Sequence, residues 1–349
     1  MLAPRRIGKT WLMDRVKEDL ESQDIRVAKL EVAGLHTEAE FLAEICKAIE
    51  KAQGAKERAW TQIVQRLKQL TGGVDAASLV QAIAKLDHRQ FLETLVESLD
   101  AEGVRTVILI DEIALFVHEL ARKDPDAARR LLYQIRKLWQ NCKNVVWFLT
   151  GSIGLDEIGR RHGMAGALLG IELFPLEPFT LEQGLSLFEE LQAQRIVSSF
   201  SFADGAFEHL ATELGWLSPY HLEHLLRLIP FAPGGAQASK AEVDAAFEKI
   251  LSPAYRTHFA GWDEHIDKNF PQEDATLMFA VLEIACETAD GEIEATYLAR
   301  LATAHPALTR RNLLDSLTAL ASDAYLVQDR ERWRFQSGLL RRYWSRYVV

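Results

Sequence analysis

Residues 3–10, Ala-Pro-Arg-Arg-Ile-Gly-Lys-Thr, are the stretch that most constrains what this chain can fold into. A Walker A loop reads Gly, four residues of any kind, then Gly-Lys-Ser/Thr, and Gly8, Lys9 and Thr10 fill the last three places. Gly8 has no Cβ, so the backbone can approach a phosphate closely, and N–H groups at the start of the following helix point at the anion. Ala3 stands where the first Gly belongs, which costs about 1 kcal/mol if that position needs a positive φ. The loop predicts a parallel α/β sheet, and a chance Gly-Lys-Thr is the alternative.

A second motif supports this interpretation. Residues 105–112, Arg-Thr-Val-Ile-Leu-Ile-Asp-Glu, form an apolar run that ends in two carboxylates, the pattern of a strand buried on both faces of a parallel sheet. At the end of that strand, Asp111 is expected to bind Mg²⁺, directly or through water, together with Thr10, and Glu112 is expected to polarise the attacking water. Lys9 is expected to reach the β- and γ-phosphates. The two motifs together predict a site for ATP and Mg²⁺, although an acidic pair also follows strands by chance.

Residues 4–10, 109–112 and 149–152 resemble the matching segments of the prokaryotic STAND-type and archaeal-type ATPases of the AAA superfamily. The resemblance covers nearly the whole chain and is strongest in its first half. It implies a P-loop domain followed by a helical domain and a winged helix. It also implies ATP binding, slow hydrolysis and use of the nucleotide as a conformational switch, but no particular substrate.

The motifs and the resemblance define a set of expected site residues. In AAA proteins a polar residue after the strand expected here over residues 144–149 senses the γ-phosphate, and Thr150 or Ser152 is the candidate, although a plain strand-ending turn would look the same. The expected catalytic residues are Glu112, Lys9 and Ser152, the expected Mg²⁺ ligands are Thr10 and Asp111, and the expected nucleotide contacts are Pro4, Arg5, Arg6, Ile7, Gly8, Lys9, Thr10 and Trp11.

Two arginines, Arg160 and Arg161, lie in a Gly-rich stretch over residues 159–170 that we expect to be a loop. They are candidates for an arginine finger offered to a neighbouring subunit. Solvated surface arginines are the favoured alternative. The expected loop is also a candidate partner contact, because it is long and shows no periodic pattern.

The start of the sequence is unusual for a Walker A loop. Such a loop connects a central parallel strand to a helix, yet only Met1 and Leu2 precede Ala3. We therefore expect the chain as given to lack that strand. A form extended upstream by about 30 residues should melt at a higher temperature, because a central strand carries a large share of the sheet contacts. Equal melting temperatures would contradict this expectation.

Hydrophobic periodicity and turn residues predict three domains, a P-loop domain over residues 1–177, a helical lid over 178–268 and a winged helix over 269–349. The fold class is α/β, with helices on both faces of the parallel sheet, followed by the two smaller domains. In the first domain we expect strands at 25–32, 105–112, 144–149 and 172–176, and helices at 11–22, 38–51, 89–102 and 127–141. Beyond it we expect helices at 180–195, 203–214, 219–229, 240–251, 274–287, 294–304, 309–321 and 337–347, and a hairpin from 324–328 and 333–335.

Charge is unevenly distributed. The net charge is −10, but residues 300–349 hold nine Arg and four acidic residues, so this segment carries +5 and the remainder −15. If the segment docks on DNA, the expected recognition helix presents Arg310, Arg311 and Asn312 to base edges, and the hairpin presents Arg330, Arg332 and Arg334 to phosphates. The alternative is that the basic segment lies against acidic parts of the same chain. We expect the basic face to be at least partly intramolecular; tight, salt-sensitive duplex binding that is lost on mutating Arg310 and Arg311 would contradict this.

Other features of the sequence exclude several classes of protein. Cys46, Cys142 and Cys286 are dispersed without a Cys-x-x-Cys pair, so neither a disulfide framework nor a zinc site is indicated. The sequence has no apolar run long enough to span a membrane and no leader pattern, and we expect a cytoplasmic protein. Its partner is an unidentified protein or a second subunit, with DNA as a candidate through the winged helix.

The sequence thus favours an ATP-binding, slowly ATP-hydrolysing molecular switch that uses its nucleotide state to rearrange the helical and winged-helix domains. The alternative is a DNA-binding regulator, or a partner-binding module of toxin–antitoxin type, in which the nucleotide site is only structural because Ala3 replaces the first glycine. A metabolic kinase is less favoured, because no acceptor pocket is recognisable.

Overall fold

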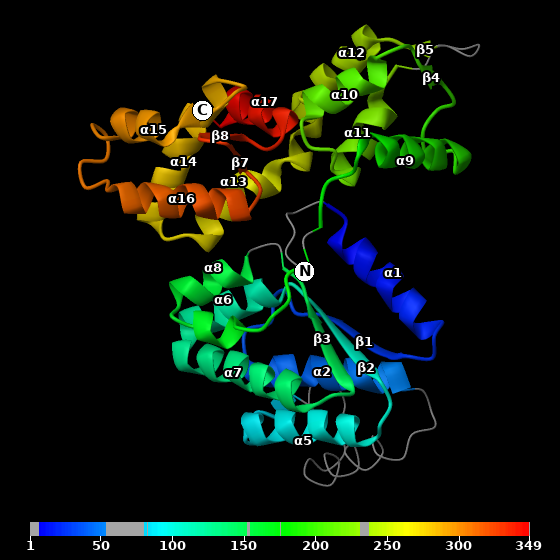
Figure 1. The fold of residues 1–349 in the computed structure, drawn as a ribbon, viewed down its shortest axis with the longest axis vertical. Coiled ribbons are helices and arrows are strands. Elements are labelled where there is room, and N and C mark those ends of the chain that lie inside the picture. Colours follow the sequence, from blue (N-terminus) through cyan, green and yellow to red (C-terminus); the bar gives the residue numbers. More distant parts are fainter. Residues whose placement is uncertain are drawn as a thin grey trace. The chain divides into compact units, whose positions relative to one another are not determined.

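The computed structural model describes residues 7–53, 80–81, 83–151, 154–174, 176–230 and 237–348. The chain divides into two compact units, whose main segments are Lys9–Leu176 and Glu177–Val349 (Figure 1). Among the described residues, no helix has the length and apolar character needed to cross a membrane.

The first unit is built on a parallel sheet of three strands in the order β1-β2-β3. Ile110 of β2 lies opposite Leu30 of β1 and Leu149 of β3, so the carboxyl ends of the three strands meet at one edge of the sheet. The elements of the unit are α1 (Lys9–Glu21), β1 (Arg26–Glu31), α2 (Glu38–Gln53), α5 (His88–Ala101), β2 (Thr106–Asp111), α6 (Ile113–Lys123), α7 (Pro125–Asn141), β3 (Val145–Leu149), α8 (Leu155–Arg161) and the 3₁₀ helix η2 (Ala165–Leu168).

The central strand β2 shows why helices cover both faces. All six of its side chains are buried, and they alternate between two cores. Ile108 and Ile110 belong to the larger core, which α2, α5, α6 and α7 complete. Val107 and Leu109 point to the other face, where they pack with Met13 of α1. The predicted parallel sheet with helices on both faces is confirmed for the described part of this unit.

Two predictions for this unit are wrong. Residues 172–174 and 176 do not form a strand, and the side chain of Leu173 is 69% exposed, because no described strand pairs with this segment. Residues 159–170 are not a loop, since α8 extends to Arg161 and η2 covers Ala165–Leu168. The sequence analysis also missed α6, which begins directly after the acidic pair.

The second unit is largely helical, and most of its helices begin and end within a few residues of the predicted positions. Thr180 and Gln183 form a capping box at the start of its first helix. Its elements are α9 (Leu181–Ala193), β4 (Ser201–Phe202), α10 (Ala206–Leu214), α11 (Pro219–Leu228), β5 (Gln237–Ala238), α12 (Lys240–Ile250), η3 (Pro253–His258), α13 (Ala260–Asn269), α14 (Gln272–Glu287), β6 (Glu292–Ile293), α15 (Glu294–Leu301), α16 (Arg310–Ser322), β7 (Leu326–Asp329), β8 (Arg332–Phe335) and α17 (Gly338–Tyr347).

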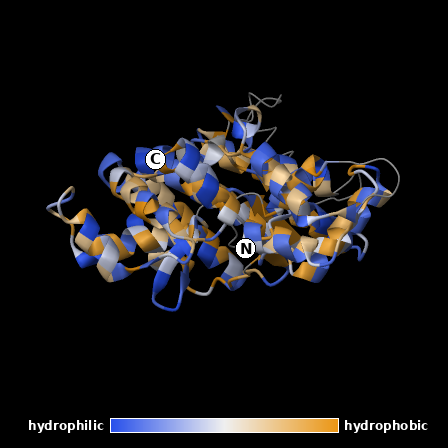
Figure 2. Cartoon of the chain, turned by 90° about the horizontal axis from the view of Figure 1, so that it is seen from above, coloured by the Kyte–Doolittle hydropathy of each residue, from blue (hydrophilic) through white to orange (hydrophobic). Residues whose placement is uncertain are grey.

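The structure adds detail that the periodicity did not predict. A short parallel pair, β4 and β5, lies within the stretch expected to be all helix. The predicted hairpin is present as β7 and β8, and β6 extends it to a three-stranded sheet in the order β6-β8-β7. The helices carry hydrophobic residues on some sides and hydrophilic residues on others, as Figure 2 shows. The boundary expected between residues 268 and 269 stays a prediction.

The last helix, α17, is anchored on α10 by a close backbone approach. Ser337 caps α17 and its hydroxyl also donates to the carbonyl oxygen of Leu214 at 3.3 Å. A Cβ added to Gly338 would lie 2.3 Å from the carbonyl oxygen of Glu213, so only glycine fits there without a shift. Arg342 on the same helix forms an ion pair with Glu213. The end of the chain is thus fixed to the helical part of this unit.

Gly338→Ala should lower the free energy of unfolding by about 2 kcal/mol or more, because the added methyl group meets backbone rather than a movable side chain. The control is Gly103→Ala, at a positive φ of 69° with open space around the new Cβ, which should cost about 1 kcal/mol through backbone strain alone. Urea denaturation measures both. A Gly338→Ala protein as stable as the wild type would contradict the close packing of α17 on α10.

Candidate nucleotide-binding site

The predicted phosphate-binding residues lie at the start of α1. Gly8 has φ of +94°, a left-handed conformation that side chains other than glycine rarely adopt. The helix begins at Lys9, two residues earlier than predicted, so Lys9 and Thr10 occupy its first turn. The N–H groups of a first turn have no partners within the helix and carry the positive end of its dipole, which favours an anion. The glycine therefore allows the turn that directs these amides outward.

The acidic motif lies beside this turn. Asp111 shares the face of β2 on which Val107 and Leu109 contact α1, because side chains alternate along a strand. Its side chain is accordingly brought to Thr10, whose hydroxyl donates to Asp111 Oδ2 at 3.0 Å. Asp111 is only 4% exposed. The structure thus brings together the two motifs that are far apart in the sequence.

The other oxygen of Asp111 is held from two sides. The backbone N–H of Glu112 donates to Asp111 Oδ1 at 3.0 Å, and the hydroxyl of Thr150 donates to the same oxygen. Thr150 reaches it because Leu149 pairs with Ile110, which places the next residue of each strand side by side. Asp111 is therefore a buried carboxylate with its orientation fixed by three donors.

Glu112 adopts an unusual backbone conformation. Its φ of 58° and ψ of 32° place it in the left-handed region, where it caps the start of α6. For a residue with a Cβ this costs of order 1 kcal/mol, and such strain is concentrated at functional sites.

The remaining expected residues are placed as follows. Ile7 is buried, whereas the side chain of Trp11 is 72% exposed. Thr150 is 2% exposed, and of the two candidate sensors it is the one that the structure describes. Pro4, Arg5, Arg6 and Ser152, together with Ala3, lie outside the described residues.

The donor set fits a magnesium ion. Mg²⁺ prefers hard oxygen ligands and usually takes one or two from the protein, with phosphate and water oxygens completing its shell. Thr10 and Asp111 offer a hydroxyl and a carboxylate that already face each other at 3.0 Å. Among the described residues, no group of three or more His, Cys, Asp and Glu side chains is arranged to hold a metal by itself.

The two arginines of α8 are not in a loop and are not isolated on the surface. Arg160 Nε donates to Glu157 Oε2 at 3.0 Å, and Arg161 Nη2 donates to Glu157 Oε1 at 3.3 Å. Glu157 is buried, so these bonds compensate a carboxylate that is removed from water. Both arginines have a partner within their own helix. Neither the arginine-finger interpretation nor the surface-arginine interpretation predicted this partner.

A histidine pair next to α8 was missed by the sequence analysis, because its members are far apart in the chain and belong to no motif. His118 Nδ1 of α6 lies 3.3 Å from His162 Nε2, at the end of α8. Burial lowers the pKa of His118 to about 4, with the positive charge of Arg161 acting in the same direction. Burial and Arg161 also lower the pKa of His162. The pair is therefore neutral at pH 7 and joins the helices that follow β2 and β3.

The residues proposed to contact nucleic acid lie on α16 in the second unit. Arg310 Nη2 is bound to Glu294 Oε2 at 3.2 Å, and the backbone N–H of Asn312 donates to the capping hydroxyl of Thr309. Arg311 is exposed at the start of the helix. One of the three is thus engaged by an acidic side chain of the same unit.

Comparisons with known proteins support the fold of the first unit. A family described as an AAA domain matches residues 2–158. The solved structure of a Walker-type ATPase of Pyrococcus abyssi is similar over 98% of this chain and 89% of its own, with 15% identity and a TM-score of 0.63. At this identity the similarity concerns the fold alone. Residues 2–158 are therefore similar to an AAA domain.

Two further structures are more distant. The ORC2 protein of Aeropyrum pernix matches with 13% identity and a TM-score of 0.42, over 96% of this chain and 82% of its own. Cdc6p of Pyrobaculum aerophilum matches with 13% identity and a TM-score of 0.42, over 99% of this chain and 85% of its own. No curated protein sequence matches the chain.

The histidine pair predicts a pH dependence of stability. The folded-state pKa of His118 lies below the value of about 6.5 for an unfolded histidine, so the unfolded state binds the proton first as the pH falls. The free energy of unfolding should therefore decrease between pH 6.5 and 4, by less than about 1.4 kcal/mol per pH unit for one proton. His118→Gln should flatten this part of the profile in urea denaturation, whereas His36→Gln, at an exposed position, should not. Parallel profiles for the wild type and His118→Gln would contradict the burial of a neutral imidazole.

Proposed function

We propose that this protein is an ATP-binding and slowly ATP-hydrolysing molecular switch. The observation that carries the proposal is the hydrogen bond between Thr10, in the first turn of α1, and Asp111, at the end of β2. It joins the two motifs that a P-loop ATPase uses for phosphate and metal. The match of residues 2–158 to the AAA domain supports a nucleotide-binding ATPase of this type.

Each residue of the site has a distinct proposed role. Gly8 permits the turn that presents backbone N–H groups to the phosphates, and the ammonium group of Lys9 neutralises the β- and γ-phosphates. Thr10 and Asp111 would hold Mg²⁺, and the bound ion would offset the negative charge that develops on the transferred phosphoryl group. Glu112 orients the attacking water and accepts its proton. Pro4, Arg5, Arg6, Ile7 and Trp11 are proposed as further nucleotide contacts, and Ser152 as a catalytic residue at the γ-phosphate.

The second unit is proposed to respond to the nucleotide as one body. Its part over residues 269–349 has the element order of a winged helix, with α14, α15 and α16 around the sheet β6-β8-β7. In addition to the contact of Gly338, α17 is fixed to the preceding helices through Arg346, which pairs with Glu248 at 2.9 Å, and through Tyr347, whose hydroxyl donates to the carbonyl oxygen of Leu251 at 2.6 Å. A relative motion of the helical and winged-helix parts would break these bonds together. The two proposed domain boundaries, at residues 177 and 268, are therefore of different kinds. We do not expect the boundary at residue 268 to be a hinge.

The alternative, a DNA-binding regulator or a partner-binding module with a structural nucleotide site, is less favoured. At least five of the nine arginines in residues 300–349 form ion pairs within the second unit, with partners that include Glu287, Glu294 and Asp329. These pairs reduce the positive charge that DNA would meet. The proposal that the basic face is partly intramolecular rests on them.

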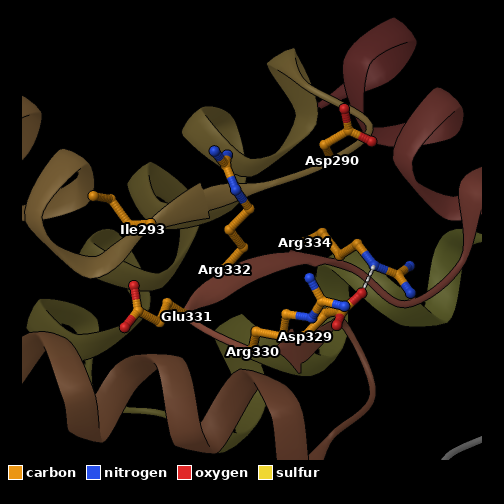
Figure 3. Close-up of a pocket in the computed structure, with 7 residues that line it drawn as sticks. All are labelled: Asp290, Ile293, Asp329, Arg330, Glu331, Arg332 and Arg334. Carbon is orange, nitrogen blue, oxygen red and sulfur yellow. Dashed lines mark ion pairs between the residues drawn. The ribbon is translucent and has the colours of Figure 1, made fainter.

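The surface around the hairpin also shows little excess of positive charge. A cavity of about 760 Å³ opens there, and Figure 3 shows the charged side chains around it. Three are basic and three acidic, namely Arg330, Arg332, Arg334, Asp290, Asp329 and Glu331. A lining in which the charges cancel suits a protein partner with charges of both signs better than a phosphate backbone.

Two substitutions separate binding from hydrolysis. Lys9→Ala should weaken ATP binding by about tenfold or more, because it removes charge-assisted contacts worth about 1.5–3 kcal/mol. Glu112→Gln should keep ATP bound and lose hydrolysis, because the amide cannot take a proton from water. Binding of a fluorescent ATP analogue and single-turnover hydrolysis of radiolabelled ATP measure the two effects.

Matched controls come from the same helices. Lys17→Ala, on α1, and Glu119→Gln, on α6, remove similar charges at positions outside the site and should leave both measurements unchanged. Hydrolysis that persists in both Lys9→Ala and Glu112→Gln would refute the proposed mechanism. Tight ATP binding without any turnover by the wild type would instead favour the structural nucleotide site.

A further inference from the structure

Thr150 is enclosed by three elements of the first unit. Its backbone N–H donates to the carbonyl oxygen of Ile110 at 2.9 Å, and its own carbonyl oxygen accepts from the N–H of Ile113 at 3.0 Å. Its hydroxyl lies beside Asp111 of β2 and 3.6 Å from the sulfur of Met13 on α1. With 2% of its surface exposed, the residue has little freedom to change its orientation.

The hydroxyl of a threonine has a single proton to donate. Of its two neighbours, the carboxylate of Asp111 is a much stronger acceptor than the thioether of Met13, and the contact with the carboxylate is the shorter one. The proton of Thr150 is therefore committed to Asp111 Oδ1. A group that senses the γ-phosphate must itself donate to a phosphate oxygen, which Thr150 could do only by giving up this bond.

The bond selects between the two oxygens of Asp111. Oδ1 receives both the hydroxyl of Thr150 and the N–H of Glu112, whereas Oδ2 faces Thr10. Without Thr150, only the N–H of Glu112 would remain to distinguish the two oxygens, and the carboxylate would be freer to rotate about its Cβ–Cγ bond. Partners that orient a ligand in this way commonly control the affinity of a metal site.

We propose that Thr150 is a positioning residue, which holds Asp111 so that Oδ2 is directed at the Mg²⁺ shared with Thr10, and that it is not the contact to the γ-phosphate. This inference rests on the proposed function, since it assumes a nucleotide–Mg²⁺ complex at the site. It deepens that function by assigning Thr150 to metal affinity and leaving Ser152 as the candidate for the γ-phosphate.

The test is a Mg²⁺ titration of the binding of a fluorescent, non-hydrolysable ATP analogue, which needs no turnover. Thr150→Val, which keeps the shape and removes the donor, should raise the half-saturating Mg²⁺ concentration by about ten- to a hundredfold. Affinity for the analogue in EDTA should stay that of the wild type. Thr150→Ser, which restores a hydroxyl, should return the Mg²⁺ requirement close to the wild-type value.

The matched control is Thr106→Val. Thr106 is buried at the other end of β2, where its hydroxyl donates to the carbonyl oxygen of Val104 at 3.2 Å, so its loss should not change the Mg²⁺ requirement. If Thr150→Val does not fold, Thr150→Cys, which offers a weaker donor of similar size, should show an intermediate increase. A Thr150→Val or Thr150→Cys protein that folds and keeps the wild-type Mg²⁺ requirement would overturn the inference, and if its hydrolysis fell at the same time, Thr150 would act on the γ-phosphate.

This outcome is distinguishable from a failure of the proposed function. If the wild type bound no analogue with or without Mg²⁺, both the switch and this inference would be overturned. If the wild type bound the analogue with a clear Mg²⁺ dependence that Thr150→Val left unchanged, only the assignment of Thr150 would be lost.

Discussion

The candidate site depends on the burial of one carboxylate. A carboxylate removed from water is costly unless donors replace its hydration, and Asp111 has three of them. They come from the first turn of α1, from the residue after β3 and from the turn that starts α6. Each of these elements is held to the sheet by its own apolar side chains, so the cores on the two faces of β2 determine where the donors lie. The hydrogen bonds to Asp111 and the apolar packing of the two cores therefore require the same arrangement of these elements.

The sequence predicted the site around Asp111, because the segments that form this site have strong local signals. The apolar run of β2 and the Gly-Lys-Thr triplet are each short and continuous, and alternation along β2 assigns Asp111 to the face that α1 covers. The sequence could not predict that the hydroxyl of Thr150 would donate a hydrogen bond to Asp111. The role of Thr150 depends on the register of β3 against β2, and register follows from the packing of whole strands.

The errors have identifiable causes. The glycines of residues 159–170 suggested a loop, but Gly159 is an interior helical residue, where an added Cβ would lie 2.6 Å from a methyl group of Leu168. That glycine permits close packing of α8 on η2, a reason that composition alone does not reveal. In the same way, the excess of arginine after residue 300 suggested an anionic partner, whereas ion pairs such as those of Arg342 and Arg346 satisfy much of it within the second unit. The sequence shows how many charged residues there are, but only the fold shows which of them are paired.

In the proposed function, the Walker A turn and Asp111 share one metal on one nucleotide. The most direct measurement is electron paramagnetic resonance of Mn²⁺, substituted for Mg²⁺, with ATP bound to the protein. The proposed function predicts one bound Mn²⁺ per chain that shows magnetic coupling to the phosphorus nuclei of ATP, and loss of this species in Asp111→Asn while the nucleotide itself still binds. An unchanged Mn²⁺ signal in Asp111→Asn, or a protein-bound Mn²⁺ without coupling to phosphorus, would contradict it.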